Sequence, residues 1–84
     1  MKHATDDSLD RLEPLLAQVR QIAGLVERKR GVWYRKSQAF LHFHEDPAGL
    51  FADLKVGRAF ERLPVDTARQ RQALLRRIKQ VLAD

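Results

Sequence analysis

The sequence predicts an α+β domain, a small antiparallel sheet of three to four strands flanked by an N-terminal and a C-terminal helix, in the order α-β-β-β-(β)-α. Apolar residues recur at every third or fourth position near both ends of the chain, which is the helical repeat. Between the ends the period changes to two, which is typical of strands. The segment 46–49, with the sequence DPAG, has the Asp, Pro and Gly positions of a type I turn. With 84 residues, the chain is expected to form a single domain, 1–84.

The first helix is expected over residues 10–23. Its apolar stripe has helical spacing, and Gly24 can adopt the left-handed conformation that ends a helix. Pro14 is tolerated only in the first turn, so the regular helix must begin just before it. Residues 1–7 are polar and acidic with no apolar face, and they are expected to be disordered. The stripe consists of Leu9, Leu12, Leu15, Leu16, Val19, Ile22 and Ala23.

Aromatic and β-branched residues that alternate with polar ones predict strands at 32–36, 39–44 and 50–56. An additional edge strand is compatible with residues 25–28, and the extended stretch 60–65 can supply one more. The turn at 46–49 fixes a register in which His42 faces Asp53 on one side of the sheet and Phe43 faces Ala52 on the other. The residue pairs on the same side as Phe43 and Ala52 are all apolar, so this side of the sheet is expected to face the core.

The last helix is expected to begin at Thr67, since Thr67 and Gln70 have the spacing of a capping box. One side of this helix is apolar and is expected to pack on the sheet. Its cations lie on the opposite side. The apolar set is Leu74, Leu75, Ile78, Val81 and Leu82, and the opposite set is Arg69, Gln72, Arg76 and Lys79.

Composition excludes several classes of function. The chain has no Cys, which removes disulfides, thiolate metal sites and cysteine nucleophiles. Glycine-rich phosphate-binding motifs and a nucleophile elbow are absent from the sequence, so we expect a binding module that is not an enzyme and needs no cofactor. No apolar run reaches the length of a membrane span and the N-terminus does not resemble a signal peptide. We therefore expect a cytoplasmic, prokaryotic-type domain without a membrane partner.

The net charge of +5 suggests an anionic partner. Cations alternate with Trp33 and Tyr34 in one strand region, and others line the outer side of the last helix. Such a surface could contact phosphates while an aromatic ring stacks on a base, which predicts weak, salt-sensitive nucleic-acid binding. The alternative is that these residues serve solubility and protect a sheet edge. The candidates are Arg28, Lys29, Arg30, Arg35, Lys36, Arg69, Arg76 and Lys79.

A second function from another class is a structural or protein-interaction domain. Phe40 and Phe51 are expected on the sheet face opposite the core, and Trp33 joins them in one of two registers. Exposed rings on one face favour a homodimer contact. The turn at Lys36 and Ser37 lacks Gly or Asn, so its length leaves open which face Trp33 and Tyr34 occupy.

The segment 42–46, with the sequence HFHED, contains the one concentration of metal-ligand residues. On a strand, His42 and His44 point the same way, and the predicted register places Asp53 across from His42. Two imidazoles and a carboxylate could hold Zn²⁺, Fe²⁺ or Mn²⁺. The alternative is an ordinary cross-strand pair on the solvent side of an amphipathic strand.

The segment 32–53, VWYRKSQAFLHFHEDPAGLFAD, resembles a group of short, uncharacterised bacterial proteins with a Y-R-K-S-x-A-F-L-H-F-H-E-D-P-x-G-L-F-A-D core. The order of helix, strand, tight turn with Lys, F-A-containing strand and return strand is similar to the first half of the MmcQ/YjbR proteins. This resemblance implies a small α+β fold. That family is often labelled DNA-binding without a well-defined site, and its C-terminal His/Trp segment has no counterpart here. The resemblance therefore implies no catalytic residue.

Overall fold

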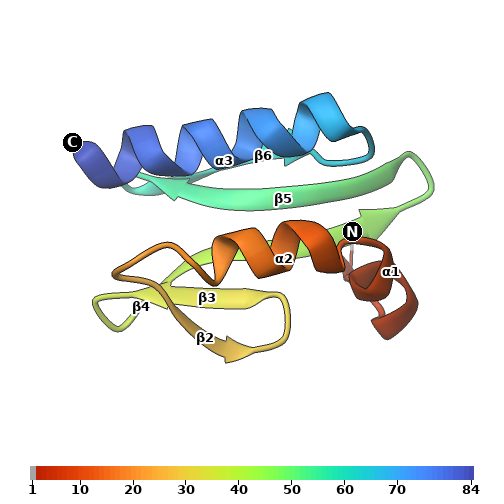
Figure 1. The fold of residues 1–84 in the computed structure, drawn as a ribbon, viewed down its shortest axis with the longest axis horizontal. Helices are drawn as coiled ribbons and strands as arrows, with labels where there is room; N and C mark the ends of the chain where they lie inside the picture. The colour runs from red at the N-terminus through yellow and green to blue at the C-terminus, as the bar shows by residue number, and fades with distance from the viewer. Residues whose placement is uncertain (1) are drawn as a thin grey trace.

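The computed structural model describes residues 2–84 and confirms the α+β class, an antiparallel sheet with N-terminal and C-terminal helices (Figure 1). The elements follow the order β1 (Lys2–His3), α1 (Asp6–Arg11), α2 (Glu13–Val19), β2 (Val26–Lys29), β3 (Val32–Arg35), β4 (Gln38–Asp46), β5 (Gly49–Val56), β6 (Ala59–Pro64) and α3 (Ala68–Ala83).

The sheet has six strands rather than three to four. Its order is β2-β3-β4-β5-β6, and β1 pairs with β4 beyond the end of β3. The optional strand at 25–28 is present as β2, and the extended stretch at 60–65 is present as β6. Both are edge strands. Their side chains are mostly exposed, so the sequence shows little of the apolar alternation that marks a half-buried strand.

The predicted register between the two longest strands is confirmed. His42 lies opposite Asp53 and Phe43 lies opposite Ala52, with Pro47 and Ala48 forming the connecting loop. The Asp46 side chain accepts a hydrogen bond of 2.7 Å from the Ala48 N–H, which closes the turn. Consequently the apolar partners face one side and the imidazoles face the other.

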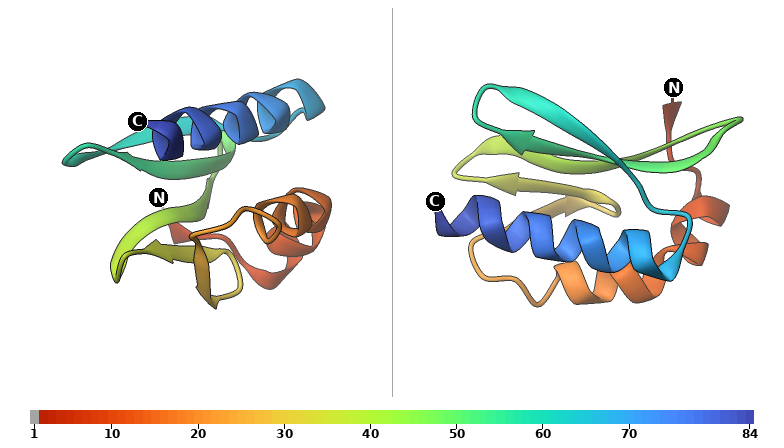
Figure 2. Two further views of the ribbon diagram at one scale, coloured as in Figure 1. Left: turned by 60° about the vertical axis from the view of Figure 1, so that its left-hand side comes forward. Right: turned by 90° about the horizontal axis from the view of Figure 1, so that it is seen from above.

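The helices α2 and α3 cover the same face of the sheet (Figure 2). In the view from above, α2 and α3 form one layer and the strands form the other, so the second face of the sheet carries no helix. The core lies between the two layers. It contains Leu12, Leu15, Leu16 and Val19 from the N-terminal segment, Trp33, Phe40, Leu41, Phe43, Ala52 and Leu54 from the sheet, and Leu74, Leu75 and Ile78 from α3.

The first helix differs from the prediction of 10–23, because it is two short helices that meet at Leu12. Pro14 lies in the first turn of α2, where its missing N–H breaks no helical hydrogen bond but a continuous helix could not pass. The predicted capping box of α3, Thr67 with Gln70, is present.

The expected disorder of residues 1–7 is wrong for residues 2–7, whereas residue 1 lies outside the described part. His3 pairs with His44 across the sheet. The Thr5 N–H donates to Glu45 Oε1 over 2.6 Å, and the Thr5 hydroxyl accepts from the Ser8 N–H as the cap of α1. His44 and Glu45 are about forty residues away from their partners in the sequence, so local composition does not reveal these contacts.

A bulge in β4 decides which aromatic residues are buried. The β3–β4 turn has two residues, Lys36 (φ 51°) and Ser37 (φ 67°), and Tyr34 pairs with Ala39, yet Trp33 pairs with Leu41. The extra residue in β4 is Phe40, and a bulge of this kind turns two successive side chains toward the same face. The open question about the turn is thereby answered: Trp33 is a core residue.

The turn at Gly49 generates a stability prediction. Gly49 has a φ of 137°, and a Cβ built there would clash with the Asp66 carboxylate, which accepts the Leu50 N–H. We expect Gly49→Ala to lower the free energy of unfolding by ~2 kcal/mol or more. Gly57→Ala is the control. Gly57 has a φ of 64°, but a Cβ built there would have no neighbour within 4 Å, so this substitution should lower the free energy of unfolding by only ~1 kcal/mol. Urea unfolding measures both; equal costs would contradict this account of the turn.

The edge strand β6 is tied to α3 by an ion pair. Arg77 donates to both carboxylate oxygens of Glu61, at 3.0 and 3.1 Å, and holds the Glu61 pKa below its ordinary value of 4.5. The pair therefore stabilises the fold above that value, and its contribution is lost as the pH falls through the folded-state pKa. We expect Glu61→Gln to lower the melting temperature by less than about 5 °C at neutral pH. Well below 4.5 the variant and the parent should melt together, and a difference that persists there would show that the effect is not ionic.

Candidate functional sites

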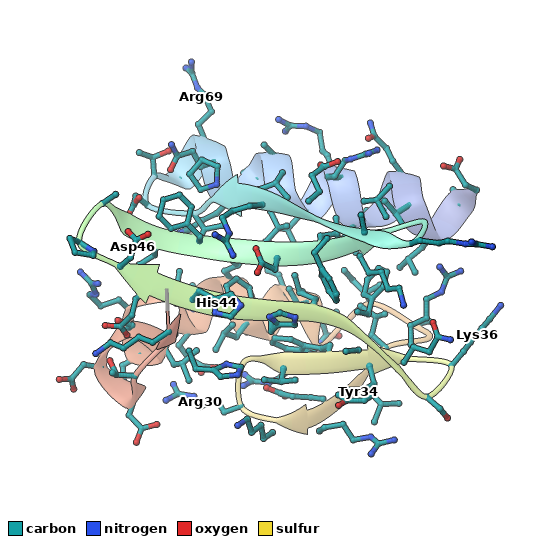
Figure 3. All side chains as sticks on the ribbon, turned by 180° about the vertical axis from the view of Figure 1, so that it is seen from behind. Arg30, Tyr34, Lys36, His44, Asp46 and Arg69 are labelled. Carbon is teal, nitrogen blue, oxygen red and sulfur yellow. The ribbon has the colours of Figure 1, made fainter. Side chains whose placement is uncertain are left out.

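The open face of the sheet carries the predicted metal-ligand residues. Strand alternation brings His42 and His44 of β4 to the same side as Asp53 of β5 and Arg62 of β6. Figure 3 looks onto this face and shows His44 near its middle. The three predicted ligands are thus brought together, as the register implied. We name His42, His44 and Asp53 the histidine cluster.

Distances within the histidine cluster are short. His42 Nδ1 lies 2.6 Å from His44 Nε2, and His44 Nε2 lies 3.1 Å from Asp53 Oδ2. One nitrogen or oxygen from each of the three residues falls within 4.8 Å of the others. Metal ligands in proteins converge in this way, with imidazole nitrogens and a carboxylate oxygen directed at one point.

Arg62 fixes the carboxylate of the histidine cluster. Its Nε and Nη2 donate to Asp53 Oδ1 and Oδ2 over 2.8 and 3.0 Å. Asp53 is only 7% exposed, and the hydrogen bonds from Arg62 hold its pKa below the usual range despite the opposing effect of burial. Arg62 was missed in the sequence analysis. The signal was the short loop at 57–58, which aligns β6 with β5 and places Arg62 opposite Asp53.

Further rings surround the two imidazoles. The ring of His3, from β1, stacks on His44 with centroids 5.2 Å apart, and the Phe60 ring lies 5.0 Å from His42. Burial, followed by the charge of His44, lowers the pKa of His42. His44 Nδ1 is buried and has no hydrogen-bond partner among the described residues.

The predicted nucleic-acid residues do not form one surface. Figure 3 places Arg69 and Lys36 toward opposite ends of the molecule and Arg30 near the β2–β3 edge. Arg30 is moreover ion-paired with Asp10 and Glu13 at 2.8 Å each, because α1 and α2 pass beside it. The other candidates are Arg28, whose guanidinium lies 4.6 Å from the Tyr34 ring, and the exposed Lys29, Arg76 and Lys79.

Two of the predicted cations do share a depression. Arg35 and Lys36 line a hollow of about 380 Å³ at the end of the molecule where the β3–β4 and β5–β6 turns lie. Lys55 lines it too and was missed, although the register from the turn at 46–49 extends to this part of β5. The hollow also includes apolar atoms of Phe40, Val56 and Val81, and Asp84 is its one acidic residue. We name Arg35, Lys36 and Lys55 the hairpin-end cations.

The predicted aromatic interaction face is wrong. Trp33 is 1% exposed and Phe40 is 3% exposed, and both belong to the core because the bulge at Phe40 turns them inward. Of the three predicted rings, Phe51 alone is partly exposed and lies on the open face. Two of the three rings predicted for a homodimer contact are therefore buried in the core and cannot contact a second copy of the chain.

Comparisons with known proteins do not assign the chain to a family: no family model, curated protein or solved structure matches it. The resemblance based on segment 32–53 stays a prediction. Among residues 2–84, no helix has the length and apolar character needed to cross a bilayer.

The burial of Trp33 generates a prediction that separates core from interface. We expect Trp33→Ala to cost ~3–5 kcal/mol of unfolding free energy, because it empties a packed site against Phe43. Phe60→Ala is the control: Phe60 is 45% exposed, and its replacement should cost under about 1 kcal/mol. Urea unfolding and sedimentation velocity measure the two effects. If Trp33→Ala changed the sedimentation coefficient but not the stability, Trp33 would be an interface residue.

Proposed function

We propose that the protein is a small non-enzymatic binding module whose hairpin-end cations bind the phosphate backbone of nucleic acid. The observation that carries this proposal is that Arg35, Lys36 and Lys55 line one hollow, whose one acidic residue is Asp84, and that none of them forms an ion pair among residues 2–84. Phosphate contacts supply most of the affinity of sequence-independent nucleic-acid binding, and they require unpaired cations on a common surface.

Ion pairing distinguishes these cations from the other basic residues. Four arginines, Arg20, Arg30, Arg62 and Arg77, are paired with carboxylates. None of the ion pairs among residues 2–84 involves a hairpin-end cation. A phosphate approaching this end therefore does not have to displace a protein carboxylate from a guanidinium or an ammonium group.

The hollow also orients its cations. The Arg35 guanidinium lies 5.9 Å from the Phe40 ring, and the Lys55 ammonium donates to Gln38 Oε1 over 3.1 Å. Both side chains are half-buried, so part of their conformational entropy is already lost before a ligand binds. This preorganisation favours binding at the hollow over binding at fully exposed cations such as Arg76.

The charge distribution along the molecule also favours binding of a polyanion at the hairpin end. Asp46 and Lys36 lie toward opposite ends in Figure 3, and the contacts of Asp66 with Gly49 and Leu50 place it beside Asp46. Glu45 and α1, which begins with Asp6 and Asp7, are joined at that same acidic end through Thr5. Arg69 lies at that end as well, so its charge is mixed, and a polyanion is attracted more strongly to the hairpin end.

Charge reversal tests this proposal. The double variant Lys36→Glu/Lys55→Glu should bind labelled single-stranded DNA and RNA at least ~10-fold more weakly at low salt, and the slope of log K against log salt should fall by about 1.4 if both contact phosphates. Asp84→Asn should bind more tightly, since Asp84 is the acidic residue in the hollow. Fluorescence anisotropy over a salt series measures these effects.

The control for charge reversal is Arg11→Glu/Arg69→Glu. It changes the net charge equally, at two exposed positions away from the hollow. If both double variants bind the nucleic acids equally weakly, net charge alone explains the effect and the hollow is not the binding site. If no probe binds the parent protein at low salt, the proposal is refuted. Concentration-dependent sedimentation without nucleic-acid binding would instead favour the protein-interaction alternative.

A further inference from the structure

We infer that the histidine cluster is a binding site for a divalent ion of the zinc type, with His42 Nδ1, His44 Nε2 and Asp53 Oδ2 as ligands. This site is independent of the proposed nucleic-acid surface. It lies on the open face of the sheet, whereas the hairpin-end cations line a hollow with none of these three residues in it.

The distances fit coordination after a small adjustment. Zinc at ~2.0–2.1 Å from each ligand in a tetrahedral site separates neighbouring ligand atoms by about 3.3–3.4 Å. The two observed separations are 2.6 Å between the imidazole nitrogens and 3.1 Å between His44 and Asp53. These two pairs would move apart by less than about 1 Å. The third pair, His42 with Asp53, lies within 4.8 Å and would close by up to about 1.4 Å, and side-chain rotations accomplish both adjustments.

Hydrogen bonding alone leaves the cluster poorly satisfied. His44 Nε2 faces both His42 Nδ1 and Asp53 Oδ2. If Nε2 accepts a hydrogen bond from the His42 Nδ1–H, its lone pair also faces the carboxylate, which is repulsive. If Nε2 carries a proton, that single N–H must serve two acceptors at once. A cation at the point of convergence is attracted to all three lone pairs.

The surroundings select the kind of ion. Arg62 already pairs with Asp53, so the carboxylate attracts an added cation less strongly than an unpaired one would. The two imidazoles must then supply most of the affinity. Imidazole nitrogen favours zinc and similar transition ions, whereas magnesium and calcium require several oxygen ligands. The site is expected to bind Zn²⁺ and Co²⁺ and to reject Mg²⁺ and Ca²⁺.

The cluster also has the features of a built site. Asp53 is buried and its carboxylate is fixed by Arg62, which donates to both of its oxygens, and the rings of His3 and Phe60 pack against the two imidazoles. These contacts restrict the ligand side chains before an ion arrives, which lowers the entropic cost of binding. Three protein ligands leave one position of a tetrahedral ion for water.

The test uses the full chain freed of metal with a chelator. Isothermal titration with Zn²⁺ should give one ion per chain, and Co²⁺ should give the visible absorption of a tetrahedral complex. The ring signals of His42 and His44 should shift in the NMR spectrum. His42→Ala, His44→Ala and Asp53→Asn should each weaken Zn²⁺ binding at least ~10-fold, with circular dichroism confirming that each variant is folded.

His3→Ala is the control variant, because His3 contacts the cluster through its ring but is not among the three ligands. It should retain binding within a few-fold. The inference is overturned if the His42 and His44 rings do not respond to roughly millimolar Zn²⁺. It is also overturned if binding survives in His42→Ala and His44→Ala. Ring signals that respond to pH but not to Zn²⁺ would mean that a shared proton occupies the cluster instead.

Discussion

The pairing of β4 with β5 is the constraint on which the rest of the structure depends. A two-residue loop and Gly49, in a backbone conformation that few other residues adopt, fix the offset between the strands. Because successive side chains alternate between faces, that offset places Phe43 and Ala52 under the helices and His42 and Asp53 on the open face. A shift by one residue would exchange the two sets and remove both the core and the histidine cluster.

A single inserted residue in β4 determines what the open face lacks. Phe40 has no partner in β3, and the resulting bulge turns it toward the core together with Leu41 and Trp33. With its largest rings buried, the open face is left with partly exposed imidazoles, Phe51, Phe60 and Tyr34. Its centre therefore combines imidazoles and a carboxylate with smaller aromatic rings such as Phe60 beside His42.

The sequence predicts those features that depend on neighbours in the chain or on one strong turn. The helical stripe of α3, its Thr67 cap and the His42–Asp53 register all follow from local patterns. The strand β1 does not follow from a local pattern, because it is held in place by pairing with β4, some forty residues away in the sequence. The bulge at Phe40 does not follow from a local pattern either. It forms because the burial of Trp33 stabilises the core more than one regular strand pair would, and the sequence pattern of β4 does not show this. The same limit applies to the sites: the register predicted the histidine cluster, whereas the partners of Arg30 and Arg62 required the packing of separate elements.

Where the carboxylates lie decides which cations are free to bind a ligand. The chain has 16 lysines and arginines and 11 acidic residues, which gives a net charge of +5. A basic surface can form only where the cations have no acidic residues beside them. Glu13 of α2 lies between Arg20 and Arg30, and Glu61 of β6 neutralises Arg77 of α3, so each of these acids joins separate elements. Among the residues that line the hairpin-end hollow, Asp84 is the one acid, and no ion pair within residues 2–84 involves the hairpin-end cations. Acids that stabilise the fold elsewhere thereby determine the position of the basic surface, which a run of basic residues in the sequence does not reveal.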